Sequence, residues 1–193
     1  MKLLEDRILK DGLLIEDRIL KVDSFLNYQI DVELTDQMGR EFARIFRGSG
    51  ATKVLTVETS GLPLAYAAAK HLGDLPLLFA KKYKPNTNID EDYAAEVRSF
   101  TKETVNMIRV PKKYLCEGEK VLIIDDFLAS GAASLGLLDL IGQAGAECVG
   151  VGVAVEKEFQ GGRALLEAKG LRVVSLAHIT RMKDGKIEFH YTE

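Results

Sequence analysis

The sequence is poor in cysteine and has no long apolar run. Cys116 and Cys148 are the only cysteines, and they form neither a metal-ligand spacing nor a disulfide framework, which fits a reducing cytoplasm. No apolar run approaches the ~18–20 residues that a membrane span needs. The segment from Met1 to Arg7 carries acids where an export signal has a basic and then an apolar region. We therefore expect a cytoplasmic protein with no membrane partner.

An excess of positive charge is also missing. The 193 residues include 26 basic and 29 acidic side chains, which gives a formal net charge of −3 at pH 7. Duplex-binding proteins normally present a basic surface, so we expect no nucleic-acid partner, although a local basic pocket for a phosphorylated small molecule is compatible with this balance. His71, His178 and His190 have no acid, serine or cysteine partner at a recognisable spacing, so we assign them no catalytic role.

Strand and helix patterns alternate along the chain. Hydrophobic residues make up 47% and charged residues 28%, which provides enough apolar material for a buried core. Apolar and β-branched runs predict strands at 53–57, 75–80, 120–124, 148–155 and 171–176. Helical spacing of apolar residues predicts helices from an N-cap at Thr35 to about Gly48 and at 62–71, 133–143 and 162–169. This alternation favours an α/β fold with a central parallel sheet flanked by helices. No segment has the composition of a linker, so we expect a single domain over 1–193.

Two other segments have weaker patterns. The hexapeptide at 5–10 recurs at 16–21, but it has no third copy, so we interpret it as coincidence. Its first copy predicts a helix that ends at Asp11 and Gly12, where glycine suits a left-handed backbone. The stretch 81–92 is polar, and Val97 to Val110 alternates loosely, as a β-hairpin does.

The most informative segment follows the strand at 120–124. Asp125 and Asp126 stand at the carboxyl end of this strand, where ligands bind in parallel α/β sheets. Adjacent carboxylates there can accept hydrogen bonds from a vicinal diol or hold a hydrated Mg²⁺. The small residues from Ala129 to Ala133 then lead into a helix, so backbone N–H groups and the positive helix end can surround a phosphate. A capped strand-to-helix turn with solvated acids is the alternative interpretation.

The segment from Val121 to Ala133 resembles the phosphoribosyl-pyrophosphate (PRPP) motif of type I phosphoribosyltransferases. The order of elements from Lys53 to Ser175 is similar to that family, and the segments 20–27 and 155–159 resemble its bacterial xanthine-specific members. The resemblance implies the type I phosphoribosyltransferase fold, with 1–50 contributing a hood over the base and 81–105 a flexible lid. It also implies purine salvage, in which the phosphoribosyl group of PRPP is transferred to N9 of xanthine, with Mg²⁺ as cofactor and a homodimer as the assembly.

The same resemblance assigns roles to residues. Asp125 and Asp126 are expected to be catalytic and to face the ribose hydroxyls, with Mg²⁺ held mainly by PRPP and through water to one of the two acids. The PRPP-binding residues are expected to be Ala129, Ser130, Gly131, Ala132, Ala133, Thr59, Ser60, Gly61 and Lys81. The purine-binding residues are expected to be Leu20, Asn27, Lys157 and Phe159. Ser99 and Lys102 are candidate lid residues.

On the phosphate side, residue chemistry agrees with these roles without being specific. Small and hydroxyl residues at 58–61 suit a second anion site, which in the family holds the pyrophosphate, but an ordinary turn has the same composition. Lys81 and Lys82 end a strand, where ammonium groups either screen the charge of a leaving pyrophosphate or are simply solvated.

On the purine side, Lys157 can donate to the O6 carbonyl of a purine, and this favours 6-oxopurines over adenine. Phe159 can stack on the base, and Leu20 can supply an apolar wall. Asn27 can reach the second carbonyl of xanthine. A solvated Lys157 and a Phe159 in the core are the alternatives.

Alanine at position 129 bears on the choice of base. Hypoxanthine–guanine members of the family carry an acid at this position, so their type of preference is disfavoured here and no general base is assigned. The alternatives are a hypoxanthine/guanine phosphoribosyltransferase, a PRPP-sensing regulator on the same fold, and a binding module that has lost its chemistry.

Overall fold

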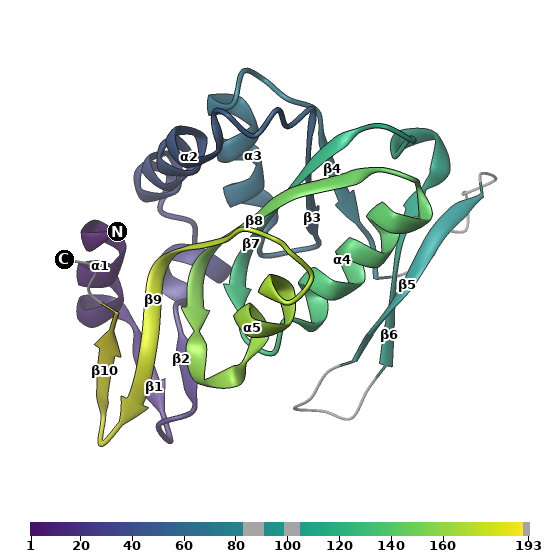
Figure 1. Ribbon diagram of the computed structural model, residues 1–193. Coiled ribbons are helices and arrows are strands. Elements are labelled where there is room, and N and C mark those ends of the chain that lie inside the picture. Colours follow the sequence, from purple (N-terminus) through teal and green to yellow (C-terminus); the bar gives the residue numbers. More distant parts are fainter. Residues whose placement is uncertain (83–90, 99–104, 191–193) are drawn as a thin grey trace.

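The computed structural model describes residues 1–82, 91–98 and 105–190, and its centre is a six-stranded sheet (Figure 1). The strand order is β10-β9-β8-β7-β3-β4, and only the edge strand β10 runs antiparallel to its neighbour. The strands are β3 (Lys53–Val57), β4 (Leu77–Ala80), β7 (Lys120–Leu128), β8 (Glu147–Lys157), β9 (Val173–Lys183) and β10 (Lys186–Phe189). This is the central, mostly parallel sheet that the sequence predicts.

Both faces of the sheet are covered. Side chains alternate between the faces of a strand, so neighbouring residues such as Leu122 and Ile123 enter different cores. Helices α1 (Lys2–Asp11), α2 (Val32–Phe46) and α3 (Leu62–His71) cover one face. Helices α4 (Ala132–Gln143) and α5 (Gly162–Glu167) cover the other, together with the hairpin β5 (Asp92–Arg98) and β6 (Val105–Pro111). Burial on both sides explains why the central strands are continuous apolar runs.

The N-terminal region is tied to the sheet by α1 and by a small hairpin. This hairpin pairs β1 (Leu13–Ile15) with β2 (Ile19–Lys21), and a π-helical turn at Asp23–Asn27 follows. The first copy of the repeated hexapeptide lies in α1 and the second in the hairpin. The two copies have different structures, which agrees with the interpretation that the repeat is coincidental. Gly12 does end α1, but its φ is −75°, not left-handed; glycine is needed because a Cβ would collide with the carbonyl oxygen of Ile8.

Several predicted boundaries are wrong. The N-cap of α2 is Asp31, whose carboxylate accepts a hydrogen bond from the amide of Leu34 at 3.0 Å, and Thr35 lies inside the helix. Strand β7 continues past Ile124 through both acids because it pairs with β8 as far as Leu128. The last predicted strand is longer than expected, and β10 was not predicted. Two short 3₁₀ helices are also present, at Lys112–Tyr114 and Glu158–Gln160. In the ranges that the structure describes, no helix combines the length and apolar character needed to cross a membrane.

Candidate active site

The acidic pair lies among the last residues of strand β7 rather than in a loop after it. Asp125 is 3% exposed and Asp126 is 9% exposed, and the Asp126 amide donates to Oδ1 of Asp125 at 3.0 Å. Burial, and after it the charge of Asp126, raises the pKa of Asp125 well above its ordinary value, while the charge of Lys82 opposes this rise. The fold therefore favours the protonated form of Asp125.

The loop at 59–61 contacts Asp125 directly. It joins β3 to α3, and its last residue, Gly61, is the N-cap of that helix. A Cβ on Gly61 would lie 2.5 Å from Oδ1 of Asp125 and closer still to Oγ1 of Thr56, so only glycine fits there without a shift. The structure thus brings two of the predicted segments, 59–61 and the acidic pair, against each other.

The small-residue loop at 129–133 leads into α4 as predicted. Gly131 is the N-cap of this helix and adopts φ 82°, a left-handed conformation that suits glycine. The amides of Ala132, Ala133 and Ser134 belong to the first helical turn, where N–H groups have no partner within the helix and can bind an anion. The loop also packs on α5, because the Gly162 amide donates to the carbonyl of Ala129 at 3.0 Å.

The two lysines at the end of β4 have different surroundings. The backbone of Lys81 pairs with that of Arg109, and its ammonium lies 5.7 Å from the ring centroid of Phe79. The amide of Lys82 donates to Oε1 of Glu58 at 2.7 Å, and the Lys82 charge acts on Asp125. Lys82, which the sequence did not single out over Lys81, therefore has an electrostatic link to Asp125.

The predicted purine residues come from two regions. Lys157 is the last residue of β8; its ammonium lies 5.7 Å from the ring centroid of Phe127 and 3.3 Å from the carbonyl oxygen of Arg18, and burial lowers its pKa. Asn27 lies in the π-helical turn, and its Oδ1 is buried with no hydrogen-bond partner among the described residues. Leu20 is buried in the core. An unpartnered buried acceptor is costly, so Asn27 is the residue of this group that most requires a ligand.

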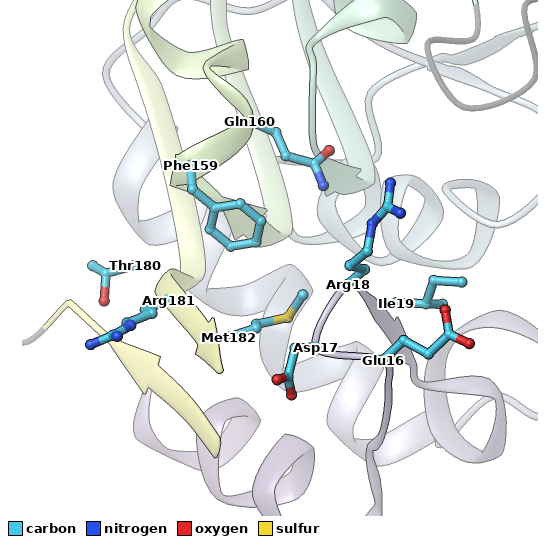
Figure 2. Close-up of a pocket in the computed structure, with 9 residues that line it drawn as sticks. All are labelled: Glu16, Asp17, Arg18, Ile19, Phe159, Gln160, Thr180, Arg181 and Met182. Carbon is cyan, nitrogen blue, oxygen red and sulfur yellow. The ribbon is translucent and has the colours of Figure 1, made fainter. Parts of the chain in front are cut away.

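A cavity of about 640 Å³ is lined by Phe159 but not by the other three predicted purine residues (Figure 2). Phe159 and Gln160 face the β1–β2 turn, with Asp17 and Arg18, across it, and the end of β9 closes a further side. Phe159 is 49% exposed, so it is not a core residue. The turn is held in place because the Asp17 carboxylate accepts hydrogen bonds from the amides of Asp184 and Gly185, at 2.8 and 2.9 Å. Sequence reasoning missed Asp17 and Arg18, since nothing local marks a contact with so distant a segment.

Not every predicted feature can be placed. Ser99 and Lys102 lie outside the described residues, as do large parts of the predicted lid at 81–105. Within the described part of the chain, no cluster of three or more His, Cys, Asp or Glu side chains could hold a metal ion.

Comparisons with known proteins identify the family of this chain. A family model described as the phosphoribosyl transferase domain matches residues 33–182. The chain is 50% identical to "Xanthine phosphoribosyltransferase 2" of Clostridium botulinum over 98% of this chain and 100% of that protein. It is also 50% identical to "Xanthine phosphoribosyltransferase" of Acinetobacter baumannii, over 98% of both.

Solved structures show the same fold at low sequence identity. The APRTase of Giardia lamblia, complexed with 9-deazaadenine, superposes with a TM-score of 0.75 at 22% identity and covers 90% of this chain and 96% of its own. The adenine phosphoribosyltransferase of Thermoanaerobacter pseudethanolicus gives a TM-score of 0.72 at 20% identity over 90% and 98% of the two chains. The fold expectation is confirmed, and the chain belongs to the type I phosphoribosyltransferase family.

Proposed function

We propose that this chain transfers the 5-phosphoribosyl group of PRPP to N9 of xanthine, giving xanthosine 5′-monophosphate and pyrophosphate in purine salvage. The observation that carries the proposal is the full-length similarity to xanthine phosphoribosyltransferases at 50% identity. The close packing of the 59–61 loop on Asp125 and of the 129–133 loop on Gly162 supports it, because these contacts bring together the segments that have to hold one substrate.

PRPP is bound through backbone groups at both of its phosphate ends. The amides of 129–133 and the start of α4 take the 5′-phosphate, because helix N-terminal amides are unpaired and carry partial positive charge. Thr59, Ser60 and Gly61 take the pyrophosphate, with Lys81 and Lys82 nearby to offset its charge. Between them, Asp125 and Asp126 bind the ribose hydroxyls, which can donate to carboxylate oxygens.

Magnesium fits this donor set only together with the substrate. Mg²⁺ is commonly bound by one or two carboxylates plus substrate phosphates, and Asp125 and Asp126 can supply that share directly or through water. When bound, the ion stabilises the charge that develops on the departing pyrophosphate.

The purine lies between the hood region and the end of β8. The Lys157 ammonium donates to O6, Phe159 packs on the ring, and Leu20 contributes to the apolar side. Asn27 pairs with the purine edge that carries the second carbonyl: its Nδ2 donates to that carbonyl, and its buried Oδ1, which otherwise lacks a partner among the described residues, accepts from a ring N–H beside it.

The chemical step is displacement at C1′ of the ribose, with inversion. Pyrophosphate leaves as positive charge develops on the ribose ring, and N9 attacks from the opposite face. The protein contributes position and electrostatic stabilisation, and the 81–105 segment acts as a lid that excludes water. Xanthine is relatively acidic and reacts as an anion, so the alanine at position 129 is no obstacle, since no general base is needed there.

Pyrophosphate release tests the proposal. The purified chain is incubated with PRPP and Mg²⁺ and with xanthine, guanine, hypoxanthine or adenine in turn. We expect the highest kcat/KM for xanthine and negligible release with adenine. A higher kcat/KM for guanine or hypoxanthine would replace the proposal with the related purine activity. No release with any base, together with PRPP-dependent retention of DNA, would replace it with a regulator.

Two further properties belong to the proposal. We propose a homodimer, which light scattering coupled to size-exclusion chromatography tests directly. The cytoplasmic location expected from the cysteine content and the N-terminal charges also stays a prediction, and cell fractionation is its test.

A further inference from the structure

The segment 157–162 connects the two halves of the proposed site. It begins with Lys157 and carries Phe159 on the purine side, and it ends at Gly162 beside the phosphate loop. A Cβ on Gly162 would lie 2.5 Å from the carbonyl oxygen of Ala129 and 2.7 Å from the amide nitrogen of Gly131. Because Gly162 packs this closely against the loop at 129–133, a displacement of Gly162 has to displace the loop.

One ion pair joins the residues on either side of this segment. Glu156 precedes it and Arg163 follows it. Nε of Arg163 lies 2.7 Å from Oε1 of Glu156, and Nη2 lies 2.5 Å from Oε2, which is the two-pronged arrangement that a guanidinium forms with a carboxylate. The ion pair therefore closes 157–162 into a loop of fixed span.

The guanidinium is also hydrogen-bonded to strand β9 and to Glu167 of its own helix, α5. Nη1 donates to the carbonyl of Val173 at 3.0 Å and to Oε1 of Glu167 at 3.0 Å. Nη2 also donates to Oγ of Ser175 at 3.2 Å. These contacts hold Arg163 and its helix α5 against β9, so both ends of the segment are fixed to the sheet.

The burial of Glu156 makes this pairing obligatory. The carboxylate is 1% exposed. Burial alone would raise its pKa, but the hydrogen bonds from Arg163 and Ser175 and the charges of Arg163 and His178 outweigh burial and hold the pKa below its ordinary value. A lysine would keep the charge but not the two-pronged geometry, so the arrangement is specific to arginine.

We propose that Arg163 is a positioning residue for both substrates: through Glu156 it sets the span of 157–162 and thereby the distance between the purine-binding residues and the phosphate loop. The inference rests on the proposed function for the identity of the substrates. It assigns Arg163 no contact with either of them.

The test separates positioning from stability. Arg163→Met leaves a buried carboxylate unpaired and should lower the thermal midpoint, whereas Glu156→Met/Arg163→Met removes both charges and should recover most of it. In both variants we expect KM for xanthine and KM for PRPP to rise by ~10-fold or more, because misplacing binding groups by ~1 Å is costly in such sites. Arg163→Lys should fall between parent and Arg163→Met. The matched control is Arg172→Met, since Arg172 contacts the carbonyl of Ile45 and the ring of Phe46, away from the site.

The exchange rate of the Gly162 amide gives a readout that needs no substrate. In the double variant this amide should lose protection, because its bond to Ala129 depends on the fixed span. A double variant with recovered stability, parental KM values for both substrates and a protected Gly162 amide would overturn the inference. If instead the parent shows no pyrophosphate release with any purine, the proposed function fails, while loss of Gly162 protection in the double variant still supports the link between the ion pair and the phosphate loop.

Discussion

Gly61→Ala is a sharp test of how the pyrophosphate loop meets the acidic pair. Gly61 has φ −70° and ψ −20°, which alanine adopts freely, so the substitution introduces no backbone strain. Its only effect is the added methyl group. That group would lie 2.5 Å from Oδ1 of Asp125, and ordinary contact begins at 3.4 Å, so the two groups have to separate by 0.9 Å.

The expected loss follows from that displacement. Thr56 and Asp125 are both buried, so the outward movement falls on the 59–61 loop. A shift of about 1 Å in a positioning element can lower a rate by ~10²-fold, and overpacking typically costs ~1–3 kcal/mol of stability. We therefore expect kcat/KM for PRPP to fall by ~10²-fold while the thermal midpoint falls by ~2–12 °C.

The assay is steady-state pyrophosphate release at saturating xanthine with PRPP varied. Gly142→Ala is the matched control, because Gly142 lies in α4 with no atom within 4 Å of the added Cβ. There alanine should be neutral or stabilise the helix by ~0.5–1 kcal/mol. Gly61→Ala with kcat/KM for PRPP within a factor of three of the parent would refute the argument that this close contact positions the loop.

Three other substitutions probe separate parts of the molecule. Asp125→Asn should abolish most transfer yet raise the free energy of unfolding at neutral pH. Because the pKa of Asp125 is raised, the folded parent binds this proton more tightly than the unfolded chain does, and parental stability falls as pH rises above the ordinary pKa of 3.8. Urea titrations should therefore show the difference in stability between variant and parent widening from pH 4 to 7. Asn27→Ala should raise KM for xanthine by ~10-fold and leave KM for PRPP unchanged, since one buried hydrogen bond is lost; equal changes in both KM values would contradict a purine-side role. Lys53→Met should lower the free energy of unfolding by about 2 kcal/mol or more with kcat unchanged, because Lys53 Nζ lies 2.5 Å from Oε1 of the partly buried Glu119. The Cys116 amide and Lys53 hold the pKa of Glu119 low against the opposing effect of burial, so this stability exists above pH ~4.5 and is lost on acidification. The corresponding loss should be missing from the acid unfolding curve of the variant.

The sequence predicted those elements whose local pattern and tertiary role agree. The strand at Lys53–Val57 and the helix at Leu62–His71 are confirmed to the residue, because an apolar β-branched run and an alanine-rich stretch have the same preference locally and in the fold. Strand β7 was predicted too short, since aspartates are poor strand residues, and only pairing with β8 keeps them extended. The repeated hexapeptide gives the same lesson, with one copy helical and the other in a hairpin.

The candidate site divides in a similar way. Its acidic pair and the 129–133 loop could be predicted because together, after an apolar strand, they resemble the PRPP motif of the family, whereas the turn at 58–61 is unspecific by itself. The link of Lys82 to Asp125, the support of the β1–β2 turn by Asp17, and the Glu156–Arg163 ion pair depend on where distant segments meet. No local pattern marks them, and only their spatial arrangement reveals them.

A common physical feature joins the segments of this site: each close contact uses a glycine that leaves no room for a Cβ. Gly61 lies against the side chains of Asp125 and Thr56, and Gly162 lies against the backbone of Ala129 and Gly131. Glycine contacts of this kind add no side-chain rotamers of their own to order when substrate binds, so the phosphate amides are held in position beforehand and less binding free energy is lost on ordering them. The same closeness makes the site sensitive to side chains that never touch substrate. For that reason loss of a guanidinium behind the phosphate loop and a methyl group added to Gly61 are both expected to weaken the use of PRPP, although neither group touches it.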